Sequence, residues 1–270
     1  MTAPDREWLE KSYEAFADIE EEFQAALDVS LEPRGPEILY ELVSAWQLRP
    51  GSLALDVGCG DGKHSLELAE RFDLDVLGID PLPRHVELAR ARVPSRLEGR
   101  MSFEVGVAEA LPVADESVAL VWCRDVLVHV TDLGQVYREF HRTLRPGGRA
   151  LVYQMFGTER LEAREGEWLW KAMGVVPQSA VPSRTEAAIA TAGLRIDECI
   201  GIGSEWGEWR DEHGAARPFL VHVARLLRDP DRYVARFGEG AYEIMLGDCL
   251  WHVYGMIGKL ERRAYLLSKR

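Results

Sequence analysis

A glycine-rich segment and a later acidic residue have the spacing of a nucleoside-binding site. The segment LDVGCGDG occupies residues 55–62, between an apolar run and a helix-forming run. Glycine lets a backbone turn sharply and come close to a ligand, and the N-terminus of the following helix offers unpaired N–H groups to an anion. Asp80 comes about 20 residues later, where a carboxylate can accept hydrogen bonds from both ribose hydroxyls. The combination predicts a nucleoside pocket.

The spacing of the glycines argues against a dinucleotide fold. A dinucleotide-binding fingerprint reads G-x-G-x-x-G, whereas residues 58–62 read G-x-G-x-G. A glycine-rich turn by itself also serves tight packing. Asp80, at the predicted end of the next strand, favours the nucleoside interpretation.

Strands and helices alternate through the first half of the chain. Short apolar runs predict strands at 53–57, 75–80, 101–107, 118–123 and 149–155. Helices are predicted between them at 63–72, 84–93 and 132–144. This order predicts βαβ units, a parallel sheet and helices on both of its faces.

Other helical patterns flank this core. Apolar residues at helical spacing predict one helix over about residues 5–27 and a second over 37–47. Beyond residue 156, helices are predicted at 158–173, 183–192, 218–227 and 231–242, with strands at 194–202 and 263–267. Ser183 and Glu186 have the spacing of a capping box. No linker divides the chain, so one domain over 1–270 is expected.

The charge and composition narrow the function classes. The chain has 270 residues and a net charge of −13, which disfavours nucleic acid as a partner unless a local basic patch exists. The arginines of residues 84–100 are one such candidate, although a solvated helix face is the favoured interpretation of them. No apolar stretch approaches the roughly 20 residues of a membrane span. No signal-peptide pattern opens the sequence, so a cytoplasmic location is expected.

The cysteines and histidines do not have the spacing of a metal site. The four cysteines are far apart, and the sequence has neither a C-x-x-C nor an H-x-x-x-H pair. We therefore expect reduced, mostly buried thiols and no metal.

Several segments together resemble the class I S-adenosylmethionine (SAM)-dependent methyltransferases. The resemblance rests on LDVGCGDG at 55–62, Asp80, the AEALP segment at 108–112, the VWCRD segment at 121–125 and LRPGG at 144–148. It covers about residues 36–156 and implies a Rossmann-like α/β fold. The implied sheet has seven strands, the last of them antiparallel, with helices on both faces and a helical cap.

The resemblance also implies a set of residues that bind SAM and its product S-adenosylhomocysteine. Gly58, Cys59 and Gly60 would contact the methionine and ribose parts, and Asp56 would lie near the amino group. Asp80 would hold the ribose. The set is completed by Pro81, Ala108, Glu109, Cys123 and Arg124. Ala108 and Glu109 would flank the adenine, although Glu109 also fits a solvated loop acid.

The segment RDVLVHV at 124–130 holds the candidate base, His129. An imidazole titrates near neutral pH and can remove a proton from an amine or a hydroxyl. The segment resembles the R-D-x-x-x-H stretch of phosphoethanolamine N-methyltransferases, which implies that Tyr13 pairs with His129. Three simpler interpretations remain open: a hydrogen-bonded structural histidine, helix packing for Tyr13, and a turn cap for Asp125, the third candidate catalytic residue.

Most tryptophans lie outside the strand–helix core, namely at positions 8, 168, 170, 206, 209 and 251. An aromatic wall could hold an aromatic or cationic acceptor, or these residues could form the core of the cap. The predicted organisation is an N-terminal lid helix at 1–35, a SAM-binding core at 36–156, and a substrate cap with the final strands at 157–270. This bulk favours a small-molecule acceptor, methylated on N or O. A SAM-binding protein without methyl transfer and a protein or RNA methyltransferase are the alternatives, and the oligomeric state is open.

Overall fold

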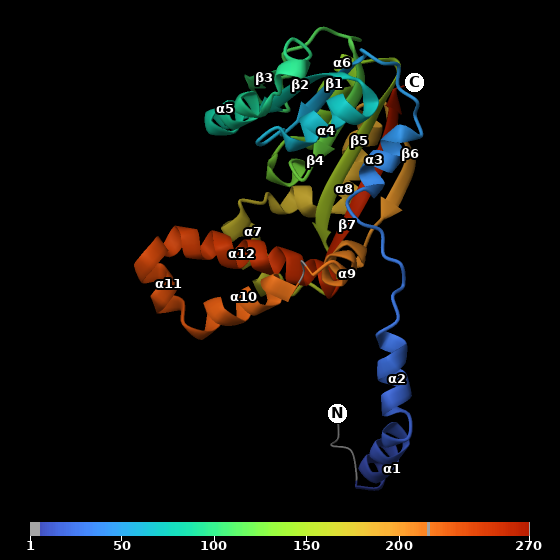
Figure 1. Ribbon diagram of the computed structural model, residues 1–270, viewed down its shortest axis with the longest axis vertical. Helices are drawn as coiled ribbons and strands as arrows, with labels where there is room; N and C mark the ends of the chain where they lie inside the picture. The colour runs from blue at the N-terminus through green and yellow to red at the C-terminus, as the bar shows by residue number, and fades with distance from the viewer. Residues whose placement is uncertain (1–5, 215–216, 270) are drawn as a thin grey trace. The chain divides into compact units, whose positions relative to one another are not determined.

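One seven-stranded sheet organises residues 34–270. The computed structural model describes residues 6–214 and 217–269, and its strand order is β3-β2-β1-β4-β5-β7-β6 (Figure 1). Strands β1 to β5 pair in parallel, and β7 is antiparallel to both β5 and β6. The strands are β1 Leu53–Val57, β2 Asp75–Asp80, β3 Met101–Val105, β4 Val118–Arg124, β5 Leu144–Gly157, β6 Leu194–Gly201 and β7 Leu260–Lys269. The predicted seven-stranded, mostly parallel sheet is confirmed.

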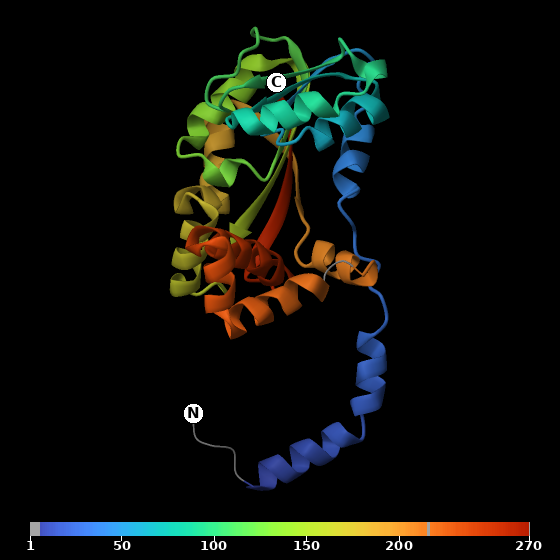
Figure 2. The same cartoon turned by 60° about the vertical axis from the view of Figure 1, so that its left-hand side comes forward.

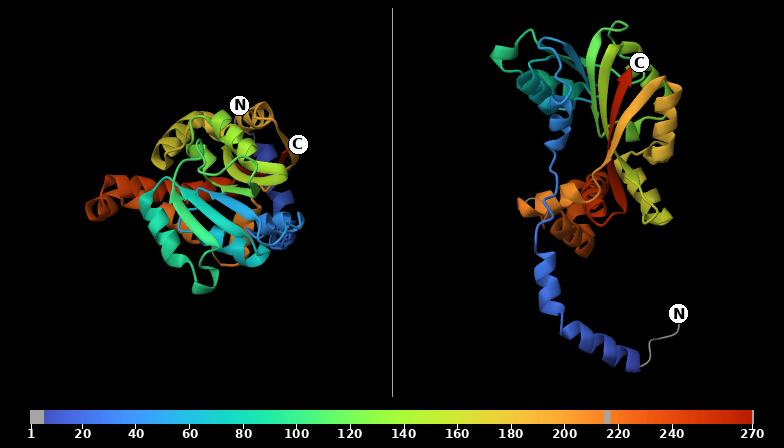
Figure 3. Two further views of the ribbon diagram at one scale, coloured as in Figure 1. Left: turned by 90° about the horizontal axis from the view of Figure 1, so that it is seen from above. Right: turned by 90° about the vertical axis from the view of Figure 1, so that its right-hand side faces the viewer.

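Helices cover both faces of the sheet (Figure 3). Helices α3 Ile38–Ser44, α4 Lys63–Phe72 and α5 Pro83–Arg92 bury Leu39, Leu68 and Val86 against one face. Helices α6 Leu133–Thr143 and α8 Pro182–Thr191 lie on the other face, where their residues join a second apolar cluster. The central strand β4 is buried on both faces, as expected for a strand between two helical layers.

Further helices gather at the end of the sheet where the parallel strands finish (Figure 2). They are α7 Ala163–Met173, α9 Glu205–Glu212, α10 Arg217–Arg228, α11 Pro230–Phe237 and α12 Glu239–Met256. Val223 and Leu226 of α10 pack against Leu246 and Cys249 of α12. Three short 3-10 turns, Ser95–Leu97, Leu127–His129 and Pro177–Ala180, complete the elements.

Two predicted details of this region are wrong. The helix expected over 231–242 is interrupted at Gly238, whose φ of +85° ends α11 before α12 begins. The capping box expected at Ser183 and Glu186 does not form, because Pro182 takes the first helical position and Val181 becomes the N-cap. A capping box forms instead between Glu162 and Glu165, at the start of α7.

The described structure divides into two compact units, residues 1–33 and 34–270. The first unit contains two helices, α1 Arg6–Ala17 and α2 Glu20–Leu27, in place of the single helix expected over 5–27. Neither helix buries a residue, and Phe16, Ile19 and Phe23 are exposed. The lid function expected for this unit stays a prediction, as does the single domain over 1–270.

Candidate functional site

A cavity of about 540 Å³ lies at the carboxyl ends of β1, β2 and β4. Most of the residues around it come from the ends of these strands and from the turns that follow β1, β2, β3 and β4, because parallel strands finish at the same edge of a sheet. Seven of the predicted cofactor residues line it: Gly58, Gly60, Asp80, Pro81, Ala108, Glu109 and Arg124. The two predicted catalytic residues Asp125 and His129 line it as well.

The glycine-rich turn is held in place by the strand beside it. The backbone N–H groups of Gly58 and Cys59 both donate to the carbonyl oxygen of Ile79, at 2.7 and 3.0 Å. Gly58 and Gly60 have φ of +76° and +54°, in the region that favours glycine. A Cβ at Gly58 would come within 2.0 Å of the Val126 side chain, whereas a Cβ at Gly60 would meet no protein atom within 4 Å. The turn therefore leaves open space beside Gly60, where a ligand can approach the backbone.

The Asp80 carboxylate ties the end of β2 to this turn. Its Oδ2 accepts from Gly60 N at 2.9 Å, and its Oδ1 accepts from Leu82 N at 2.9 Å. His85 Nδ1, from the first part of α5, lies 3.1 Å from Oδ1. Sequence reasoning missed His85, which lies in the first turn of α5 and so close to the end of β2.

Three predicted cofactor residues are not among those that line the cavity. Asp56 is buried and accepts from Ser65 Oγ at 2.6 Å, and burial raises its pKa to about 7. Cys59 and Cys123 are also buried, and burial raises the pKa of both thiols. Their roles toward a cofactor stay predictions.

A second cavity, of about 270 Å³, adjoins the first. Both cavities are lined by Arg124, Asp125 and His129. The second is bounded further by residues from β5, α7, α9, α12 and β7, namely Tyr153, Met155, Met173, Trp206, Arg210, Asp248, Trp251, His252 and Arg262, together with Val128. The predicted catalytic segment therefore lies at the junction of two spaces.

The His129 ring is oriented by a backbone carbonyl. Its Nδ1 lies 2.9 Å from the carbonyl oxygen of Gly174, which follows α7. A carbonyl can only accept a hydrogen bond, so Nδ1 carries the proton and Nε2 of the neutral ring has a free lone pair. His129 is exposed rather than buried, so its ring can meet a ligand.

Asp125 occupies a strained position beside it. Its φ is +56°, an uncommon value for a residue other than glycine, and its N–H donates to Tyr153 O at 2.9 Å. Among the described residues, nothing donates to its buried Oδ1. Burial raises the pKa of Asp125, and the neighbouring Arg124 opposes that shift. The turn-capping role considered for this residue is not seen, since no side chain caps the 3-10 turn at Leu127–His129.

Arg124 is positioned by a hydrogen-bonded chain of two rings, the half-buried His64 and the buried Tyr40. Its guanidinium donates to His64 Nε2 at 2.7 Å, and His64 Nδ1 lies 2.5 Å from the Tyr40 hydroxyl. An arginine can only donate, so His64 is neutral with its proton on Nδ1. Burial and then the charge of Arg124 lower the pKa of His64 to about 3, which agrees with that state.

Only part of the predicted aromatic wall faces the second cavity. Trp206 and Trp251 line it, and Trp206 stacks on Tyr153 with ring centroids 4.5 Å apart. Trp168 and Trp170 pack around buried Leu169 of α7. Trp209 stacks on His213, and Trp8 lies in the first unit, as does Tyr13. The pairing of Tyr13 with His129 stays a prediction.

The described residues contain neither a metal-binding cluster nor a membrane-spanning helix. No group of three or more histidine, cysteine, aspartate or glutamate side chains there could hold a metal ion. No described helix is long and apolar enough to cross a membrane. All four cysteines are free, and only Cys199 is exposed.

Comparison with known proteins agrees with this geometry. Residues 55–152 match the family model described as a methyltransferase domain. Methyltransferase GfsG of Streptomyces halstedii is 39% identical over 119 residues, which are 44% of this chain and 43% of that protein. The 27-O-demethylrifamycin SV methyltransferase of Amycolatopsis mediterranei is 33% identical over 159 residues, 55% of this chain and 58% of that protein. The chain thus matches only about half of the length of these relatives.

Solved structures share the fold over most of the chain. Phosphoethanolamine N-methyltransferase 2 of Haemonchus contortus, solved with phosphomonomethylethanolamine and S-adenosylhomocysteine, has a TM-score of 0.66 at 20% identity and covers 89% of this chain and 54% of that one. The [4+2]-cyclase SpnF has a TM-score of 0.68 at 20% identity and covers 100% and 97%. Residues 55–152 thus match a methyltransferase domain, and the chain shares the Rossmann-like fold of SAM-dependent methyltransferases over most of its length.

Proposed function

We propose that this chain transfers a methyl group from SAM to a nitrogen or oxygen atom of a small-molecule acceptor. The junction of the two cavities is the observation that supports this most directly, because Arg124, Asp125 and His129 line both. A cofactor in the first cavity and an acceptor in the second would meet beside groups that can take a proton or hold a charge.

The first cavity has the features that SAM requires. Its volume of about 540 Å³ lies within the roughly 300–1,000 Å³ of small-molecule sites. Asp80 Oδ2 accepts one hydrogen bond from the protein, so a lone pair remains for a ribose hydroxyl. Gly60 has open space where a larger residue would place its Cβ. When bound, SAM would supply a methyl group on a sulfonium, ready for in-line displacement.

The chain's own residues would align the acceptor and accept its proton. His129 Nε2 has the free lone pair, and the Gly174 carbonyl keeps the ring in one orientation. The Asp125 carboxylate lies close enough to His129 that it would stabilise the imidazolium that forms when the ring takes a proton. The proposed pairing with Tyr13 would place a hydroxyl from the first unit at the same ring.

A SAM-binding protein without methyl transfer is the second candidate. It is favoured by the fold shared with the [4+2]-cyclase SpnF over nearly the full length of both chains. A protein or RNA methyltransferase fits less well, because the net charge is −13 and the second cavity holds only about 270 Å³.

Transfer from methyl-labelled SAM into metabolite mixtures tests the proposal. We expect a labelled small molecule and an equal amount of S-adenosylhomocysteine. Tight binding of SAM with no label transferred to any metabolite fraction would favour the second candidate. Absence of SAM binding would contradict both.

A further inference from the structure

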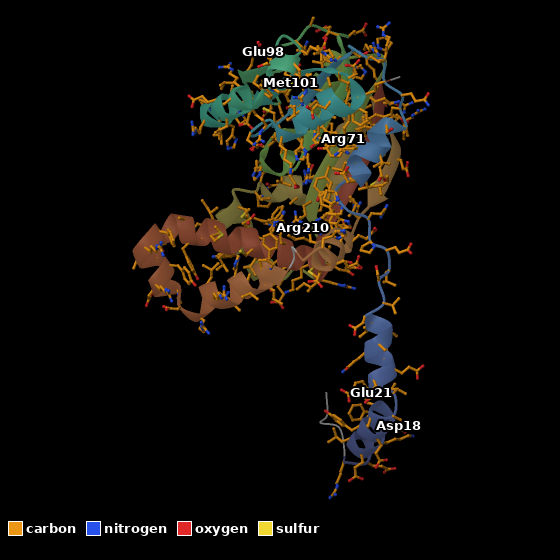
Figure 4. All side chains as sticks on the ribbon, in the orientation of Figure 1. Asp18, Glu21, Arg71, Glu98, Met101 and Arg210 are labelled. Atoms are coloured by element: carbon orange, nitrogen blue, oxygen red, sulfur yellow. The ribbon has the colours of Figure 1, made fainter. Side chains whose placement is uncertain are left out.

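Three arginines from separate elements line the second cavity. Arg124 ends β4, Arg210 lies in α9 (Figure 4), and Arg262 lies in β7. β7 is antiparallel to β5, and Arg262 pairs with Met155 near the carboxyl end of β5. Arg124 of β4 pairs with Tyr153, which lies two residues earlier in β5. The topology therefore brings three positive charges to one space.

Each guanidinium keeps most of its donors unused. Arg124 donates through Nη1 to His64, Arg210 through Nη1 to His252, and Arg262 through Nη1 to the carbonyl of Gly203. No other hydrogen bond of these groups is found within the described part of the chain. A guanidinium has five N–H donors, so Nε and Nη2 of all three remain available.

These arginines also differ from three other arginines, Arg71, Arg100 and Arg142, in their charge partners. Arg71, Arg100 and Arg142 each form ion pairs with two carboxylates. Within residues 6–214 and 217–269, neither Arg124, Arg210 nor Arg262 has a carboxylate oxygen at ion-pair distance. Arg262 is nevertheless almost fully buried.

The cavity therefore carries excess positive charge. Its two carboxylates are Asp125 and Asp248, against three arginines, and burial raises the pKa of both acids. Burial and then the nearby Arg262 lower the pKa of Arg210. His252 is neutral, because burial lowers its pKa to about 4. A buried charge without a partner is costly. A local surplus of positive charge within a chain of net charge −13 therefore indicates an anionic ligand.

We propose that the methyl acceptor carries an anionic oxygen group, a carboxylate or a phosphate, which Arg124, Arg210 and Arg262 bind in this cavity. The inference rests on the proposed function and specifies its substrate class. The anion would occupy the arginine side of the cavity, and the atom to be methylated would lie toward Asp125 and His129, at the junction with the first cavity.

Stacking alone does not account for the cluster. The Arg124 guanidinium lies 5.2 Å from the Trp206 ring centroid and 5.7 Å from that of Tyr153, and the Arg210 guanidinium lies 5.6 Å from the Phe219 centroid, so stacking accounts for one face of two of the three arginines. Arg262 packs directly on Gly255 of α12, where an added Cβ would come within 2.3 Å of Nη2. A glycine there admits the guanidinium, and its far side stays open to the cavity.

Calorimetric titration with small anions tests the proposal. The full chain would be titrated with inorganic phosphate and with acetate, both with and without saturating S-adenosylhomocysteine. We expect saturable binding of at least one anion, and the tighter of the two identifies the group on the acceptor. Arg210→Gln should weaken that binding by roughly tenfold or more, since charge-assisted hydrogen bonds are lost. Arg195→Gln, on β6 and paired with Asp197, is the matched control.

Two further variants test the sign of the charge and the geometry. Asp248→Asn removes a negative charge from the cavity and should tighten anion binding about threefold to tenfold. Gly255→Ala should displace the Arg262 guanidinium and weaken anion binding. Helix α12 should still form, because the added methyl group meets only the flexible end of the Arg262 side chain.

The outcomes separate this inference from the proposed function. No saturable binding of either anion, equal losses in Arg210→Gln and Arg195→Gln, or no tightening in Asp248→Asn would each overturn the anion site. Failure to bind S-adenosylhomocysteine would instead overturn the proposed function, and the cofactor-free titration would still decide the anion site.

Discussion

The two adjoining cavities are built in different ways. The larger one is formed mainly by the strand ends and turns of one continuous half of the sheet, β1 to β4, between residues 57 and 130. The smaller one is shaped by side chains from segments that span residues 124 to 262. SAM is common to many proteins, and the strand ends and turns around the larger cavity are enough to bind it. Recognition of one particular acceptor depends on the side chains around the smaller cavity. Variants should therefore separate into those that impair cofactor binding and those that impair transfer.

The largest effect is expected at the junction of the cavities. His129→Ala removes the free Nε2 lone pair and should lower kcat by roughly 10²- to 10⁴-fold, the usual contribution of a positioned base. The affinity for S-adenosylhomocysteine, measured by calorimetry, should change little. His222→Ala, on α10 and outside both cavities, serves as the control. Unchanged turnover in His129→Ala would contradict the role of His129 as the general base.

A second prediction concerns the glycine-rich turn. Gly58→Ala places a methyl group against Val126 in a left-handed backbone, and should lower the free energy of unfolding by about 2–5 kcal/mol. Binding of S-adenosylhomocysteine should weaken with it. Gly147→Ala has the same kind of backbone, with φ of +73°, but meets no atom within 4 Å. Equal losses of unfolding free energy in the two variants, measured by urea unfolding, would show that the contact with Val126 does not contribute to the cost of Gly58→Ala.

A third prediction concerns pH. Burial raises the pKa of Asp56 to about 7, well above that of an unfolded aspartate, so the folded protein favours the protonated acid. The stabilisation is complete below about pH 4 and is lost as the pH rises through about 7, a change on the order of 4 kcal/mol. Asp56→Asn should flatten that part of the curve of unfolding free energy against pH. An unaltered curve would show that Asp56 ionises freely in the folded state.

The smallest effect is expected at the ribose carboxylate. Asp80→Ala should raise the dissociation constant of S-adenosylhomocysteine about tenfold to a hundredfold, because charge-assisted hydrogen bonds are lost. At saturating cofactor, kcat should recover. Asp61→Ala, in the same turn but paired on the surface with Arg92, should bind normally. A large fall in kcat that persists at saturating cofactor would contradict the assignment of Asp80 to cofactor binding alone.

The same contrast explains how far the sequence could be interpreted. Short apolar runs that end in glycine or polar residues predicted β1, β2 and β4 correctly. The spacing of the glycines and the aspartate along the chain predicted Gly58, Gly60 and Asp80 as cavity residues. Nothing local marks Arg210 or Arg262 as a cavity residue. Their convergence depends on the antiparallel register of β7, which a single sequence does not display. The break at Gly238 was missed for a related reason, because an apolar helical pattern continues across it.

The position of β7 has a consequence for how the chain is assembled during synthesis. This strand comes last among the described elements, yet it lies between β5 and β6, and its register pairs Ser268 with Arg149. The turns around Gly58 and Asp80 can form on the ribosome well before that strand emerges. Until it does, β5 and β6 each present an unpaired edge, the kind of surface that promotes aggregation. The nascent protein should thus acquire its nucleoside pocket early and depend on chaperone protection until residues 260–269 are released.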